Sequence, residues 1–176
     1  MAHGLLADRA ELEALFDELA GELSRLGVRA EVVMVGGAWL LWHTQRAATR
    51  DVDSARQLAA EVSEAVATIS ARHDLARDWL NDHAAAFWPA DATFDDCDVV
   101  FERDALVVRA PSADVVFLMK LYRADPQDRE DMISLWPLCA FETPDDAARA
   151  FRDAYPHAPD DQHLADYIAD IARDAT

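Results

Sequence analysis

The chain has 176 residues, of which 52% are hydrophobic, and carries a formal net charge of −18 at pH 7. This length and hydrophobic content exclude a disordered chain and are sufficient for a substantial core. We therefore predict a single domain over residues 1–176, with a core of about 28–136 and a helical extension of about 137–176. The acidic charge opposes nucleic-acid binding, which depends on lysines and arginines that displace counterions, so no DNA partner is expected.

The two cysteines, Cys97 and Cys139, follow no recognisable disulfide or zinc-binding pattern. Reduced thiols are typical of the cytoplasm, and we expect the protein there. The first residues lack a charged start and a long apolar run, so no signal peptide is expected. No stretch approaches the roughly 18 apolar residues that span a membrane, so no membrane association is predicted.

The hydrophobic pattern alternates between helical and strand periods, which predicts an α/β fold with a mixed sheet and flanking helices. Apolar residues from Leu12 to Leu26 share one helical face, and Gly27 ends that helix. A Val-rich strand is predicted at 30–35, a helix at 37–46 and a short strand at 50–54. A helix over 58–69, a short helix around Trp79 and Asn81, and strands near 97–102 and 105–110 are predicted next. A helix follows Ser112, with Val115, Leu118, Met119 and Tyr122 pointing inward. The remaining predicted elements are a helix between Pro126 and Pro137, a helix from Thr143-Pro144, and a last helix through Leu164 and Ile171.

Asp51 and Asp53 are one residue apart in a predicted extended segment, so their side chains are expected to share a face. Two adjacent carboxylates repel each other unless they are solvated or bridged by cations. Such oxygen ligands suit Mg²⁺ or Mn²⁺, which can assist in-line displacement at a phosphate. The alternative is a solvated turn, because the chain is rich in aspartate.

Gly36 and Gly37 lie between the predicted strand at 30–35 and the helix that follows. Glycine lets the backbone approach a ligand closely, and the N–H groups at a helix start can bind an anion. The pair forms neither a Walker A loop nor a dinucleotide fingerprint. Two interpretations stay open, a phosphate site and a tight strand-to-helix turn, and both can hold together.

The segment from Gly36 to Asp53 resembles the nucleotidyltransferase superfamily. The residues that carry the resemblance are Gly36-Gly37-Ala38, Arg46, Thr49 and Asp51-Val52-Asp53. The segment is most similar to small bacterial members near the AbiEii toxin-type and related nucleotidyltransferase-like proteins. Further similar blocks are Leu118-Met119-Lys120-Leu121-Tyr122 with Asp128-Arg129-Glu130-Asp131-Met132, and Trp79-Leu80-Asn81. The resemblance covers about residues 30–136 and implies a nucleotidyltransferase-like mixed sheet.

This resemblance implies a role for each matching residue. Asp51 and Asp53 would bind Mg²⁺ or Mn²⁺, and Thr49 would position the strand that carries them. The triphosphate of an NTP would be bound by Gly36, Gly37 and Arg46.

The second block carries its own implied roles. Lys120, the sole lysine of the chain, would stabilise developing charge, and Asp128 would orient it or assist the metal. The structural alternatives are a surface lysine at position 120 and helix-dipole contacts for Asp128 and Asp131.

The superfamily also tends to place a third carboxylate on a later strand. Asp98 is the candidate for this third metal ligand, with Glu102 as the second choice. Similar members carry a basic residue where this chain has Asp125, although Arg123 lies close by.

The sequence therefore predicts metal-dependent transfer of a nucleotidyl group from an NTP to an acceptor hydroxyl on tRNA or protein. Analogy with toxin-type members suggests a toxin–antitoxin connection. A tRNA acceptor would need a local basic patch, for which the candidates are Arg46, Arg50, Arg56, Lys120 and Arg123. The alternative is a catalytically inactive member that acts as a binding or antitoxin-like protein toward a cognate, basic protein partner.

Overall fold

The computed structural model describes residues 4–175, which form two compact units. The first unit contains residues 4–86 and 97–110, and the second contains residues 87–96 and 111–175. The expectation that no signal peptide is present rests partly on residues 1–3, which lie outside the described range. The prediction of a single domain over the whole chain stays a prediction.

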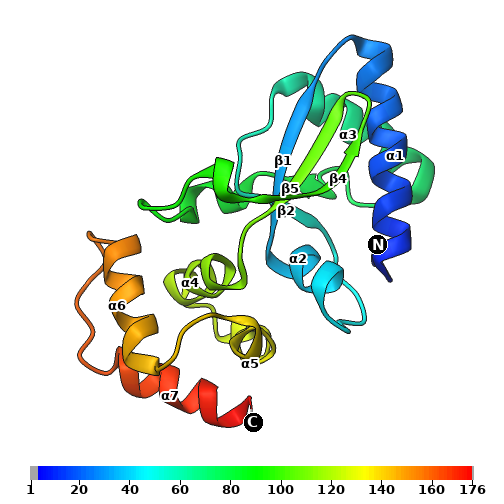
Figure 1. Cartoon of the computed structure of the whole chain (residues 1–176). Coiled ribbons are helices and arrows are strands. Elements are labelled where there is room, and N and C mark those ends of the chain that lie inside the picture. The colour runs from blue at the N-terminus through cyan, green and yellow to red at the C-terminus, as the bar shows by residue number, and fades with distance from the viewer. Residues whose placement is uncertain (1–3, 176) are drawn as a thin grey trace. The chain divides into compact units, whose positions relative to one another are not determined.

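The predicted α/β fold class is confirmed, since the described residues form a five-stranded mixed sheet accompanied by helices (Figure 1). The first unit contains α1 (Arg9–Leu26), β1 (Ala30–Val35), α2 (Gly36–His43), β2 (Val52–Ser54), α3 (Ala60–His73), β3 (Leu80–Asn81), β4 (Asp98–Arg103) and β5 (Leu106–Ala110). The second unit contains α4 (Ala113–Arg123), α5 (Arg129–Leu135), α6 (Pro144–Ala154) and α7 (Leu164–Asp174). Short 3-10 turns lie at His83–Phe87, Phe94–Asp96, Pro126–Asp128 and Trp136–Leu138.

The strand order of the sheet is β3-β2-β1-β5-β4. The central strand β1 pairs in parallel with β5 and antiparallel with β2. Strand β2 pairs in parallel with β3, and β4 pairs antiparallel with β5. The next strand along the chain after β1 is therefore β2, which carries Asp53 and lies directly beside β1.

One face of the sheet forms the main hydrophobic core together with α1 and α3 (Figure 1). Val32 and Met34 of β1 are fully buried in this core. Because side chains alternate along a strand, Val33 and Val35 point to the opposite face. Asp53 is the lateral partner of Val35 and shares this second face. The sheet thus separates the main core from the predicted metal ligands.

Three predicted elements are shorter or different in the structure. The strand predicted at 50–54 begins only at Val52. The helix predicted at 37–46 ends at His43, where Thr44 turns to extended backbone and its hydroxyl donates to the carbonyl oxygen of Leu40. The short helix predicted around Trp79 and Asn81 is wrong, because Leu80–Asn81 is strand β3. This strand forms by pairing with a distant segment, and the N–H of Val52 donates to the carbonyl oxygen of Trp79 at 2.6 Å.

The predicted inward face of α4 is also partly wrong. Leu118 and Met119 are buried as predicted, but Tyr122 is 39% exposed and Val115 is only partly buried. The buried arc extends instead to Val116, Phe117, Lys120 and Leu121. Apolar residues occur all around this helix, so periodicity alone does not define which side packs.

Aromatic side chains pack against one another in the second unit. The ring of Phe117 lies 5.5 Å from that of Trp136 and 6.0 Å from that of Phe141. Tyr122 stacks on Tyr155 with 4.0 Å between ring centroids.

None of the helices between residues 4 and 175 has the length and apolar content needed to cross a bilayer.

Candidate functional site

The candidate site is built around strand β2 in the first unit. Val52 is fully buried, whereas Asp51 and Asp53 on either side of it are partly exposed. This alternation confirms that the two aspartates flank a residue that points into the core. Asp53 lies between Val35 of β1 and Asn81 of β3 as the lateral partner of both.

Gly36 allows the chain to pass close to Asp53. Its φ angle is +65°, in the left-handed region that side chains other than glycine rarely adopt. A Cβ at this position would lie 2.8 Å from the Oδ2 atom of Asp53. A larger residue would therefore have to displace the carboxylate or change the turn that begins α2.

Gly37 allows a second close approach, from the segment that precedes β2. A Cβ on Gly37 would lie 2.6 Å from the Thr49 hydroxyl oxygen and 3.7 Å from Cζ of Arg46. The Arg46 Nε atom donates to the carbonyl oxygen of Ala48 at 3.0 Å. The start of α2 is therefore packed against Thr49 and Arg46, two residues that carry the family resemblance.

Thr49 is fixed in place by backbone and side-chain hydrogen bonds. Its N–H donates to the carbonyl oxygen of Leu6 at 3.0 Å, and its own carbonyl oxygen accepts from Leu6 at 2.8 Å. Its hydroxyl donates to the carbonyl oxygen of Asp51 at 3.1 Å. These contacts connect the backbone at Asp51 to the bridge between Leu6 and Thr49.

The residues present fit a hard divalent cation. Gly36, Gly37, Thr49, Asp51 and Asp53 all lie within one compact unit. Magnesium is commonly held by one or two carboxylates while water and substrate phosphate complete its coordination. The Oδ2 atom of Asp53 lies in the space beside Gly36 that a side chain would otherwise fill, which places this carboxylate at the start of α2. Across residues 4–175, no group of three or more histidines, cysteines, aspartates or glutamates is arranged to hold a metal ion.

Asn81 is a site residue that the sequence patterns did not identify. Its position on β3 places it directly beside Asp53, and it is only 7% exposed. Its Oδ1 atom accepts the N–H of His83 at 3.0 Å. The Trp79-Leu80-Asn81 block is part of the family resemblance, but its sequence predicts a helix. Because a helix does not pair with β2, the sequence does not reveal that Asn81 lies beside Asp53.

Asp98, the predicted third carboxylate, lies on strand β4. Strands β1 and β5 lie between β2 and β4 in the sheet order. Asp98 is therefore three strand spacings, ~14 Å, from the strand that carries Asp53. Its assignment as a metal ligand stays a prediction without support from the strand order. Glu102 lies further along the same edge strand.

Lys120 belongs to the second unit and is buried there, so the surface-lysine alternative is wrong. It is 6% exposed, and its ammonium donates at 2.8 Å to both Asp128 Oδ1 and Asp131 Oδ2. Arg123 Nε lies 3.1 Å from the second carboxylate oxygen of Asp128, close enough for an ion pair but not aligned for a hydrogen bond. The predicted roles of Lys120 and Asp128 in catalysis stay predictions.

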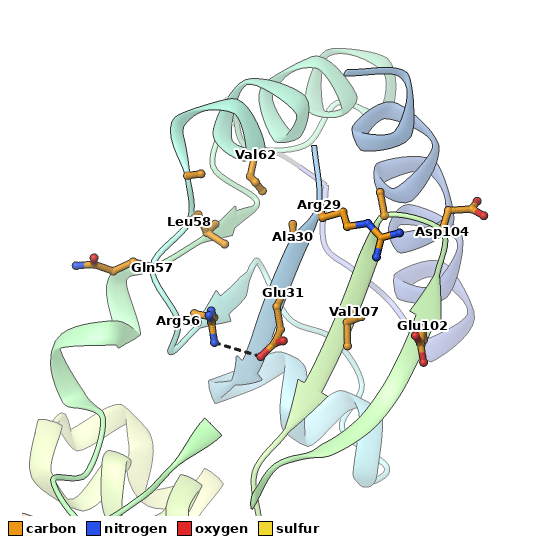
Figure 2. Close-up of a pocket in the computed structure, with 12 residues that line it drawn as sticks. Arg29, Ala30, Glu31, Arg56, Gln57, Leu58, Val62, Glu102, Asp104 and Val107 are labelled. Atoms are coloured by element: carbon orange, nitrogen blue, oxygen red, sulfur yellow. Dashed lines mark hydrogen bonds and ion pairs between the residues drawn. The ribbon is translucent and has the colours of Figure 1, made fainter. Parts of the chain in front are cut away.

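A separate pocket of about 410 Å³ lies in the first unit, near the start of β1 (Figure 2). Its apolar wall includes Leu58, Val62 and Val107. Figure 2 shows Arg56 turned toward Glu31, and their charged atoms are 3.2 Å apart. Glu31 therefore neutralises part of the positive charge of Arg56, one of the residues predicted to form a basic patch for tRNA.

Comparison with known proteins identifies one family. The family described as "Nucleotidyltransferase of unknown function (DUF6036)" matches residues 10–136. No curated protein and no solved structure matches the chain. The family match supports the nucleotidyltransferase superfamily but not the narrower toxin-type group. The match spans the glycines, the Asp51–Asp53 strand and the Lys120 block, and the chain belongs to this nucleotidyltransferase family.

Proposed function

We propose that the protein transfers a nucleotidyl group from an NTP to an acceptor hydroxyl, with Mg²⁺ or Mn²⁺ held by Asp51 and Asp53. The observation that carries this proposal is the close approach of Gly36 to Asp53. It brings the N-terminus of an α-helix, which attracts phosphate, next to a carboxylate that attracts a cation. A nucleoside triphosphate bound to a divalent cation combines these two charges.

Each residue of the first unit has a distinct task in this proposal. The backbone N–H groups that follow Gly36 and Gly37 bind phosphate oxygens, and Arg46 adds a guanidinium that suits phosphate geometry. Thr49 holds the Asp51 backbone through its hydroxyl hydrogen bond. When bound, the cation would neutralise charge on the triphosphate and polarise the reacting oxygens. Catalysis of this kind depends on positioning and electrostatics.

The proposal extends to Lys120 and Asp128 in the second unit. The Lys120 ammonium would stabilise charge that develops on phosphate, and Asp128 would orient it. The ammonium has three N–H donors and uses two of them for Asp128 and Asp131, so the third can donate to a phosphate oxygen.

The acceptor is proposed to be a protein or tRNA, by analogy with the toxin-type members that the sequence resembles. The net charge of −18 favours a protein with a basic surface over tRNA. The pairing of Arg56 with Glu31 also weakens the proposed basic patch for RNA. A toxin–antitoxin role is part of the same analogy.

A second candidate function is that of an inactive family member that binds a nucleotide or a protein partner. The observation that favours it is the neutral side chain of Asn81 beside Asp53. The acidic Asp125, where similar proteins carry a basic residue, points the same way.

Incubation with each labelled NTP, Mg²⁺ and either total tRNA or a protein extract separates the two functions. The proposed enzyme transfers label to one acceptor class, and Asp51→Asn and Asp53→Asn abolish this transfer. An inactive member binds an NTP but leaves every acceptor unlabelled. Transfer that is unchanged in both variants would show that the proposed site is wrong.

A further inference from the structure

We infer that Asn81, a neutral side chain beside Asp53, limits the Asp51–Asp53 centre to one divalent cation. The inference rests on the proposed function, because it concerns the same metal centre. It goes beyond that function by assigning a cation stoichiometry and a role to a residue on a strand that the sequence did not predict.

The strand register places Asn81 where it can influence the centre. Asp53 and Asn81 are partners in the parallel ladder of β2 and β3. Partners on neighbouring strands have Cα atoms ~4.8 Å apart, and their side chains point to the same face. The other lateral partner of Asp53 is Val35, which is apolar. Asn81 is therefore the polar side chain that flanks Asp53 within the sheet.

The chemistry of Asn81 explains why it would limit the centre. An amide carries no charge, and its Oδ1 atom already accepts the N–H of His83 at 3.0 Å. Its Nδ2 atom points toward the carbonyl oxygen of Asp78 at 3.4 Å, a long hydrogen bond. The side chain is thus turned into local backbone contacts while it remains 7% exposed. It adds no negative charge beside Asp53.

Two cations roughly 4 Å apart repel each other strongly, and a pair needs carboxylates that offset this repulsion. Within the part of the chain that the structure describes, no third acidic or other metal-binding side chain completes such a group. Asp98 is three strand spacings away from β2. The centre of this chain therefore has the charge for one cation, and any second cation would have to arrive with the phosphates of the substrate.

Electron paramagnetic resonance of the full chain with Mn²⁺ alone tests this inference. The parent is expected to bind one Mn²⁺ whose signal disappears in Asp53→Asn, which distinguishes it from ions attracted to the acidic surface. Asn81→Asp adds a carboxylate beside Asp53 and is expected to raise the stoichiometry from one to two, with the coupled spectrum of neighbouring ions. Asn81→Ala, the matched control, is expected to stay at one.

The outcomes separate this inference from the proposed function. A coupled Mn²⁺ pair in the parent would overturn the inference and leave the proposed metal centre intact. A single ion in a folded Asn81→Asp variant would also overturn it. No Asp53-dependent binding in the parent would instead refute the proposed centre itself. The parent spectrum decides the stoichiometry even if Asn81→Asp fails to fold.

Discussion

The hydroxyl oxygen of Thr49 lies 2.6 Å from the point that a Cβ would occupy on Gly37, closer than a Cβ atom approaches other atoms in folded proteins. The adjacent Gly36 has the same relationship with Asp53, at 2.8 Å. The close packing of Thr49 and Asp53 against the start of α2 therefore requires glycine at both positions. A tight turn and a phosphate site, which the sequence left as alternatives, are compatible in this geometry.

Alanine at either glycine is expected to destabilise the protein. Gly36→Ala places a side chain at a φ of +65° and against a carboxylate oxygen, and Gly37→Ala meets the Thr49 hydroxyl. Each substitution is expected to lower the free energy of unfolding by about 1–3 kcal/mol. Urea denaturation measures both changes.

Gly21 provides the control for these substitutions. It lies within α1, and a Cβ there would meet no atom within 4 Å. Gly21→Ala is expected to stabilise the protein by about 0.5–1 kcal/mol, because alanine favours the helix. In the Gly37→Ala background, Thr49→Ala should restore part of the lost stability by removing the hydroxyl. Independent, additive effects of these two changes would contradict the predicted contact.

Removing the Lys120 ammonium is expected to be costly whether or not it takes part in catalysis. Lys120→Met leaves the carboxylates of Asp128 and Asp131 without their shared partner, and Asp128 is almost fully buried. Breaking a buried pair in this way lowers the free energy of unfolding by about 3–5 kcal/mol. The nearby guanidinium of Arg123 offsets part of this loss.

Arg149→Met is the matched control for Lys120→Met. Arg149 pairs with Asp146 on the exposed side of α6, and its side chain is 68% exposed. Exposed pairs of this kind contribute little to stability, so little change is expected. Equal effects of the two substitutions would show that the Lys120 cluster is not a structural ion-pair network.

Cys139 is expected to react slowly in the native protein. Burial raises the pKa of its thiol, and the nearby charge of Asp114 raises it further. Since the thiolate is the reactive form, a raised pKa keeps the thiol unreactive at pH 8.5, where an ordinary cysteine is about half ionised. Alkylation of Cys139, followed by mass spectrometry, should accelerate strongly in urea. Equal rates in the native and unfolded protein would contradict this assignment.

The sequence predicted those elements whose residues carry a strong local pattern. The strand at 30–35 and the end of α1 at Gly27 occur as predicted, because the apolar run and the left-handed glycine act locally. Strand β3 was missed, since two residues form a strand only through pairing with β2, which is distant in sequence. The role of Asn81 beside Asp53 was hidden for the same reason.

Lys120 shows a second limit of prediction from sequence. A lysine on a mostly apolar helix suggests a side chain that reaches water. Its burial depends on Asp128 and Asp131, which lie in the next turn and helix and converge on the ammonium only in the folded unit. The order of strands likewise separates Asp98 from β2, which no local pattern reveals.

The most direct test of the proposed metal and nucleotide site is calorimetric titration of each NTP with and without Mg²⁺. The parent is expected to bind one NTP only when Mg²⁺ is present, and Asp53→Asn is expected to weaken that binding at least ~10-fold. Asp98→Asn, on the distant edge strand, is expected to bind as the parent does. Absence of Mg²⁺-dependent binding in the parent, or equal affinity in Asp53→Asn, would contradict the proposed site.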